Sequence, residues 1–92
     1  MSTTALVLGV EAARRSLTEL DGFDEIVVLD PSTAELERLV EELADPRLDY
    51  LLGELPVLPL PDASVDLLVG ADSADAEVVR VLRPDGRAEP AA

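Results

Sequence analysis

The sequence predicts a small α/β domain built around a parallel β-sheet. Two observations support this: short apolar runs of strand length indicate strands buried on both faces, and segments with helical spacing of apolar residues lie between them. Right-handed crossover connections place four such strands in the order 3-2-1-4. The third run has mixed polarity, which suits an edge strand. The expected strands are Ala5–Leu8, Glu25–Asp30, Arg47–Gly53 and Val65–Gly70.

About three helices are expected to flank this sheet. Apolar residues at helical spacing predict the first helix after the first strand, up to Gly22. The second begins at a capping-box pattern formed by Ser32 and Glu35 and ends before a proline. The third extends from about Ser73 to Arg83 and stops at the Pro-Asp-Gly turn that follows.

The composition bounds both the size and the chemistry of the chain. Its 92 residues fit one domain, which we place at residues 1–87, followed by a short flexible tail at residues 88–92. Cysteine and histidine are absent. This excludes disulfides, thiolate metal sites, cysteine nucleophiles, and histidine as a general base or zinc ligand. The sequence therefore yields no metal site and no catalytic residue.

The charge is strongly negative. Twenty acidic residues stand against seven basic ones, so the formal net charge is −13 at pH 7. Such a field repels phosphate backbones and anionic lipids, so we expect no binding to nucleic acid or membranes, whereas a basic protein partner fits. The N-terminal stretch lacks the cationic region and the long apolar run of a secretory signal, and no segment is long enough to span a membrane. The predicted location is the cytoplasm.

Three stretches of the sequence carry motifs. Gly53–Val69 reads GELPVLPLPDASVDLLV, Val79–Arg87 reads VRVLRPDGR, and Ile26–Ser32 is an apolar strand with an acidic end. Together they resemble the class I S-adenosylmethionine-dependent methyltransferases, which commonly read G-D-A-x-x-L-P-F-P-D-x-S-F-D-L-V and R-V-L-K-P-G-G. The resemblance implies a Rossmann-like methyltransferase half-domain, truncated and degenerate. The residues that match the first motif in register are Gly53, Leu58, Pro59, Pro61, Asp62, Ser64, Asp66 and Leu67.

The resemblance places a candidate cofactor site at the carboxyl ends of the first strands. Where the family reads G-x-G-x-G, this chain keeps Gly9 but has Glu11 and Ala13 at the later glycines. Glu11 would enter the space of the cofactor's aminoacyl part, where it opposes a carboxylate or meets an amino or sulfonium group. Asp30 matches the family's ribose-binding acid and Glu54 the acid beside the adenine. Each has a simpler interpretation: Asp30 serves the start of the second helix, and Glu54 is a solvated loop charge.

The C-terminal part departs most from the family. The loop that normally carries substrate-binding and catalytic residues after the fourth strand is almost deleted, and the family's fifth strand and hairpin are expected to be missing. The fourth strand would then form an exposed apolar edge, with Val65, Leu67 and Val69 as the contact residues. We expect a second copy, in a two-fold dimer or an open assembly, or a different protein to cover it. The alternative is a monomer whose C-terminal tail shields this edge.

These observations lead to three functional hypotheses. The first is a non-catalytic methyltransferase-like module, a pseudoenzyme, which assembles with itself or a partner through the fourth-strand edge and needs no cofactor. The second is a regulatory subunit that still binds S-adenosylmethionine. The third is one part of a methyltransferase completed by a second polypeptide. We expect no enzymatic activity from the chain on its own.

Overall fold

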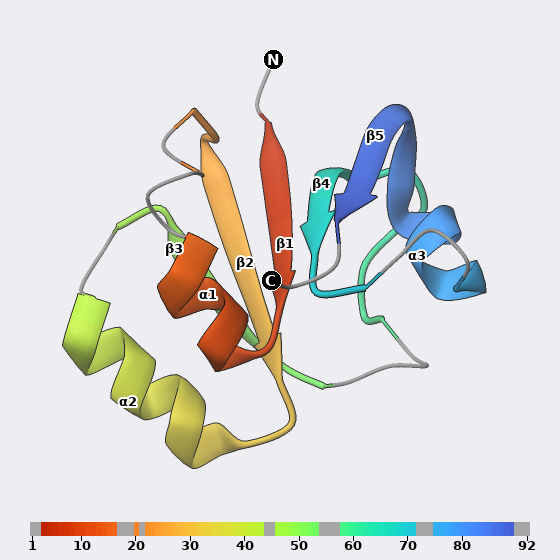
Figure 1. The fold of residues 1–92 in the computed structure, drawn as a ribbon. Helices are drawn as coiled ribbons and strands as arrows, with labels where there is room; N and C mark the ends of the chain where they lie inside the picture. The colour runs from red at the N-terminus through yellow and green to blue at the C-terminus, as the bar shows by residue number, and fades with distance from the viewer. Residues whose placement is uncertain are drawn as a thin grey trace.

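The computed structural model describes residues 3–16, 20, 22–43, 46–53, 58–71 and 75–89. Its helices pack around a central sheet (Figure 1). The strands are β1 (Thr4–Leu8), β2 (Glu25–Asp30), β3 (Leu48–Leu52), β4 (Val65–Val69) and β5 (Leu82–Glu89), and the helices are α1 (Val10–Ser16), α2 (Thr33–Leu43) and α3 (Ala76–Val81).

The five strands form one parallel sheet in the order β3-β2-β1-β4-β5. The first four have the predicted order 3-2-1-4, and β3 lies at an edge, as its mixed polarity indicated. β1 lies in the middle, and its three central residues are fully buried. Its continuous apolar run is thus explained by a strand that is covered on both faces.

Two apolar cores lie on opposite faces of the sheet. On one face, Val10 of α1 and Leu39 of α2 belong to the same core as Val7 of β1. On the other, Val78 of α3 shares a core with Leu6 of β1. The two neighbouring β1 residues point to opposite faces because side chains alternate along a strand. This division gives the sheet helices on both sides (Figure 1).

The second helix begins as predicted. The backbone N–H of Glu35 donates a hydrogen bond of 3.3 Å to Ser32 Oγ, and the N–H of Leu36 donates to the Ser32 carbonyl at 3.1 Å. These bonds satisfy N–H groups that have no partner inside the helix. The last part of the predicted first helix, residues 17–19 and 21, lies outside the described residues.

The third helix is shorter than predicted. α3 starts at Ala76, after Asp75, whose side chain accepts a hydrogen bond of 2.9 Å from the Glu77 N–H. The predicted start at Ser73 lies outside the described residues. At the other end Leu82 already has extended backbone angles (φ −74°, ψ 138°), so the chain leaves the helix before the Pro-Asp-Gly turn and enters β5.

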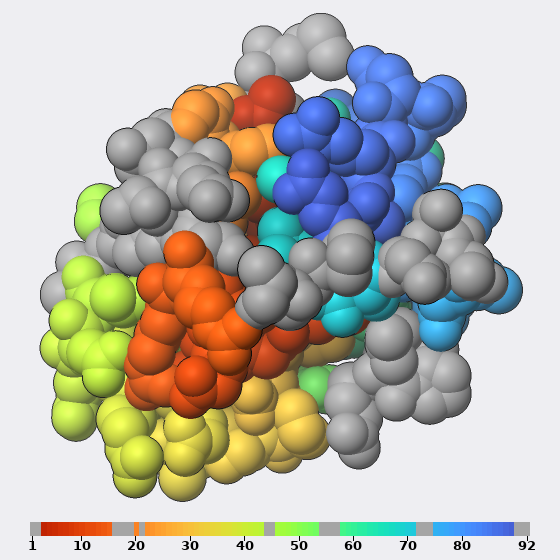
Figure 2. All heavy atoms as spheres, viewed as in Figure 1, coloured from red at the N-terminus to blue at the C-terminus, as the bar shows by residue number. Residues whose placement is uncertain are grey.

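The prediction that β4 forms an exposed edge is wrong, because β5 pairs with it. Residues 67–69 lie in parallel register with residues 87–89, and Figure 2 shows β5 beside β4. Val65, Leu67 and Val69 are buried, with at most 6% of their surface exposed. The alternative named for this edge was a monomer whose C-terminal tail shields it; in the structure a full strand, residues 82–89, covers the edge, and only residues 88 and 89 of it come from the expected tail. Residues 88 and 89, expected in a flexible tail, belong to β5.

The pairing of β5 with β4 is interrupted by a bulge. Leu82 lies opposite Val65 and Arg87 opposite Leu67, so residues 83–86 bulge out of the register. α3 ends beside the start of β4, because the N–H of Ser64 donates to the Val81 carbonyl at 2.8 Å. The chain therefore needs few residues to return along β4. The expectation that a fifth strand is missing is therefore wrong.

Candidate functional site

The carboxyl ends of β1 and β2 form the candidate site. Gly9 follows β1, and its N–H donates a 2.7 Å hydrogen bond to the Leu29 carbonyl of β2. Its φ of +98° lies in a region that side-chain-bearing residues rarely adopt, and apart from its two chain neighbours no described residue has an atom within 4 Å of the position that a Cβ would take. The one glycine retained from the family pattern thus stands beside open space.

Asp30 links this site to both neighbouring helices. One oxygen of its half-buried carboxylate accepts a 3.0 Å hydrogen bond from the Val10 N–H, at the start of α1. The other accepts a 2.9 Å hydrogen bond from the Ser32 N–H, before α2. The simpler interpretation of Asp30, service to the start of the second helix, is therefore seen directly. A carboxylate has about four acceptor positions, so these two bonds leave capacity for a hydroxyl donor.

Glu11 does not lie in the space above Gly9. Its side chain is 77% exposed and pairs with Arg14, one turn later in α1, at 3.2 Å. Arg14 Nε in turn donates a 2.7 Å hydrogen bond to Glu42 of α2, which raises the pKa of the Arg14 guanidinium. α1 starts directly after Gly9, where the family pattern has further glycines, and the Ala13 N–H closes the first turn on the Gly9 carbonyl at 3.2 Å. Glu54 lies outside the described residues.

A second glycine shapes the same edge of the sheet. Gly70 follows β4 with a φ of +113°, and a Cβ there would lie 2.9 Å from both the Cβ and the carbonyl oxygen of Leu8. Only glycine allows the ends of β1 and β4 to approach this closely. The sequence reasoning gave Gly70 no role, although its position directly after a buried strand was an available signal.

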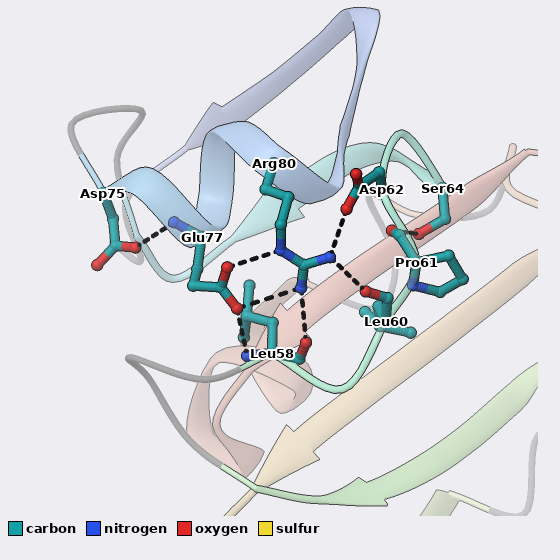
Figure 3. Close-up of polar contacts among 8 residues, drawn as sticks. All are labelled: Leu58, Leu60, Pro61, Asp62, Ser64, Asp75, Glu77 and Arg80. Atoms are coloured by element: carbon teal, nitrogen blue, oxygen red, sulfur yellow. Dashed lines mark hydrogen bonds and ion pairs between the residues drawn. The ribbon is translucent and has the colours of Figure 1, made fainter.

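Arg80 of α3 holds the connection that leads into β4 (Figure 3). Its terminal nitrogens donate hydrogen bonds of 2.8 Å to the carbonyls of Leu58 and Leu60, and of 2.7 Å to the Asp62 carboxylate. Glu77 accepts from Arg80 Nε at 2.6 Å and from the Leu58 N–H at 3.0 Å. The planar guanidinium can serve these acceptors together because it has five donors in a fixed geometry.

This cluster alters the acidity of its members. The pKa of Glu77 is lowered, first by the hydrogen bond from Arg80 and then by the Leu58 N–H. The pKa of Arg80 is raised, first by Glu77 and then by Asp62. The sequence reasoning did not assign Arg80 a role, although it stands at the arginine of the R-V-L-K-P-G-G-like stretch. The cluster is a structural clamp between α3 and the connection.

The motif residues around β4 act in turns and at strand entry. Ser64 Oγ donates a 2.8 Å hydrogen bond to the Pro61 carbonyl. Asp66 accepts a 2.8 Å hydrogen bond from the Thr4 N–H at the start of β1. Asp62 accepts from Arg80, as described above. The matched motif therefore explains how β4 joins the sheet.

Within the described ranges, no group of three or more acidic side chains is arranged to hold a metal ion. In the same part of the chain, no helix has the length and apolarity needed to cross a membrane.

Comparisons with known proteins bear on this site. A scan against protein-family models gives no match, and a search of curated proteins gives none either. Among solved structures, the chain is similar to a putative type II methyltransferase from Anaeromyxobacter dehalogenans, with 29% identity and a TM-score of 0.74 over 92% of this chain and 38% of that one. It is also similar to a chain in the complex between the Haloferax volcanii Trm112 methyltransferase activator and the putative methyltransferase (26% identity, TM-score 0.74, 92% of this chain and 42% of that one).

A third similar structure supports the fold alone. It is a putative S-adenosyl-L-methionine-dependent methyltransferase from Methanococcus maripaludis, with 23% identity and a TM-score of 0.77, covering 94% of this chain and 46% of that chain. The chain thus spans roughly two fifths of the length of the solved relatives it matches. The sheet order and these likenesses show a Rossmann-like α/β fold that is similar to part of the fold of S-adenosylmethionine-dependent methyltransferases.

Proposed function

We propose that this chain is a methyltransferase-like module that binds an S-adenosyl nucleoside at the carboxyl edge of its sheet and does not transfer a methyl group on its own. The observation that carries the proposal is the pairing of Gly9, with open space beside its left-handed backbone, and the half-buried Asp30 at the end of β2. Ligands of this fold class bind outside the carboxyl ends of the strands, and an acid at the end of the second strand receives the ribose hydroxyls.

Three residues have defined parts in this proposal. Asp30 keeps its two backbone hydrogen bonds and accepts from a ribose hydroxyl with its remaining capacity. Gly9 allows the ligand to approach the backbone. The side chain of Glu11 pairs with Arg14 and leaves the space beside Gly9 open. Its negative charge nevertheless weakens binding, because it repels a ligand carboxylate.

Isothermal titration calorimetry with S-adenosylhomocysteine tests the proposal. We expect saturable binding by the unmodified chain, and a decrease of about tenfold or more in Asp30→Asn because a charged acceptor is lost. The thermal midpoint of each protein without ligand separates a folding defect from a binding defect. The proposal fails if the unmodified chain shows no binding at millimolar ligand, or if a folded Asp30→Asn binds equally well.

A matched pair of variants tests the part of Glu11. Glu11→Gln should bind the ligand more tightly than the unmodified chain. Glu41→Gln, an exposed change on α2 with the same change in net charge, should leave affinity unaltered. An equal effect of the two variants would show that only the net charge of the protein matters.

A second candidate function is one part of a methyltransferase that another polypeptide completes. Two observations favour it: the chain spans roughly two fifths of the length of its solved relatives, and one of these relatives is found in a complex with an activator. In the described fold β4 is covered, so any partner or second copy has to use a different surface.

Size exclusion with light scattering, with and without S-adenosylhomocysteine, tests self-assembly against the 9.8 kDa mass of the chain. A monomer at all concentrations excludes the homo-oligomer and leaves a different protein as the partner.

A further inference from the structure

The sheet ends in two edges of different character. β5 contains Pro84, bulges between its two pairing regions, and carries an Arg87–Glu89 ion pair of 3.2 Å. Proline and bulges are features that make an edge unsuitable for further pairing. β3 at the other edge pairs with β2 without interruption over five residues and contains no proline. β3 is therefore the edge that can accept another strand.

The backbone of β3 is oriented to accept a strand. The Ile26 N–H donates to the Arg47 carbonyl at 2.9 Å, and the Gly53 N–H donates to the Asp30 carbonyl at 3.1 Å. In a parallel strand these directions alternate from residue to residue, so the N–H and carbonyl groups of Leu48 and Leu52 point away from β2. Leu48 has a buried side chain, whereas 60% of Leu52 is exposed. The edge thus combines outward backbone groups with an exposed apolar side chain.

The charge around this edge determines which partner fits. Leu48 belongs to the core covered by α1 and α2, and Leu52, four residues later, lies on the same face of the sheet. α2 and β3 together carry one basic residue, Arg38, and five acidic residues: Glu35, Glu37, Glu41, Glu42 and Asp49. Glu35 pairs with Arg38 at 3.5 Å and Glu42 with Arg14 of α1 at 2.7 Å, so the negative charge at this edge comes chiefly from Glu37, Glu41 and Asp49. A second copy would bring an equal negative cluster to the same edge, in addition to a net charge of −13 on each chain. Self-pairing at β3 is therefore disfavoured.

We propose that the β3 edge binds an extended segment of a basic protein partner, which adds a strand to the sheet. Backbone hydrogen bonds at Leu48 and Leu52 would supply the pairing, and an apolar partner side chain would cover Leu52. Lysine or arginine side chains of the partner would face the carboxylates of α2 and β3, which favours fast association and excludes acidic strands. This inference concerns a surface separate from the Gly9 and Asp30 site and holds independently of ligand binding there.

A synthetic peptide tests this surface. The probe is the hexapeptide Lys-Thr-Val-Thr-Lys-Thr, in which lysine and valine lie on one face of the strand, and its counterpart has glutamate in place of lysine. Hydrogen exchange measured by NMR should slow at the Leu48 and Leu52 amides with the basic peptide and remain unchanged with the acidic one. Raising the salt concentration should weaken the effect, because the attraction between exposed charges is screened.

Two matched variants separate strand addition from general charge attraction. Leu52→Lys should weaken binding of the basic peptide by about tenfold or more, since it removes apolar burial and adds a repelling charge. Val79→Lys, at a side chain of α3 that is 56% exposed, makes the same change in charge elsewhere and should leave affinity nearly unaltered. Both positions are exposed, so thermal midpoints should confirm that both variants fold.

Other results would overturn the inference. They are equal weakening by the two variants, no change in exchange along β3, protection at β5 in place of β3, or equal binding of the acidic peptide. A concentration-dependent dimer that protects the same Leu48 and Leu52 amides without any peptide would also overturn it, because the occupant would then be a second copy.

Discussion

At the scale of single residues, Glu77 shows how one carboxylate connects α3 to the rest of the fold. Its pKa is lowered in the folded chain by Arg80 and the Leu58 N–H, so it stabilises the fold while it is ionised. This contribution is present above the carboxyl pKa of the unfolded chain, about 4.3, and is lost as the pH falls through the lower folded value. Urea midpoints should therefore be clearly lower for Glu77→Gln than for the unmodified chain at pH 7, and the two should converge only when the pH falls below the lowered pKa of Glu77.

The control for this pH dependence is Glu37→Gln, which removes an exposed charge from α2. Its difference from the unmodified chain should be small at every pH, because an exposed side chain contributes little. A Glu77→Gln difference that stayed constant from neutral to acidic pH would show that the clamp does not depend on ionisation.

Gly70 is the second residue whose role can be tested alone. Gly70→Ala should lower the free energy of unfolding by about 1–3 kcal/mol, since the new Cβ meets Leu8 and the backbone has a positive φ. Gly22→Ala is the matched control, because no described atom lies within 4 Å of its new Cβ, and it should change stability by less than about 1 kcal/mol. Urea unfolding of both proteins measures the difference, and similar values would refute the close approach of β1 and β4.

At the scale of elements, β5 covers β4, and Gly86 makes this pairing possible. A Cβ on Gly86 would lie 3.0 Å from the carbonyl oxygens of Val65 and Asp66, and backbone atoms cannot move aside easily. Gly86→Ala should therefore displace β5, lower the free energy of unfolding by about 1–3 kcal/mol, and speed hydrogen exchange in β4. Light scattering should then show association that increases with concentration, because an apolar edge is exposed. Unchanged exchange and mass would mean that β5 is not required to protect β4.

At the scale of the whole molecule, the net charge of −13 opposes folding through self-repulsion. Raising NaCl from about 0.1 M to about 1 M shortens the screening length from about 10 Å to about 3 Å, so the urea midpoint at pH 7 should rise. The control is the same salt series near the pI of about 4.1, where the repulsion is absent and the rise should be much smaller. Equal rises of the urea midpoint at the two pH values would mean that salt stabilises the fold by a general effect and not by screening the net charge.

Local patterns in the sequence predicted most of the elements. Continuous apolar runs indicated β1, β2 and β4, mixed polarity indicated the edge position of β3, and Ser32 with Glu35 indicated the start of α2. These features can be predicted because periodicity and capping act within one segment of chain. The motif around β4 likewise indicated the family, and Asp30 was correctly placed at the end of β2.

The tertiary structure alone decided three features. Which segment covers β4 depends on where α3 ends, and the short return into β5 has no local signature. The Arg80 clamp joins residues 18 to 22 positions apart, and Asp30 reaches Val10 across 20 positions. Arg14 of α1 reaches Glu42 of α2 across 28 positions, a contact that no local pattern specifies. By itself, then, the sequence determined the type and order of the first four strands. The fifth strand and the contacts that shape the site arise only when segments distant in the sequence pack against one another.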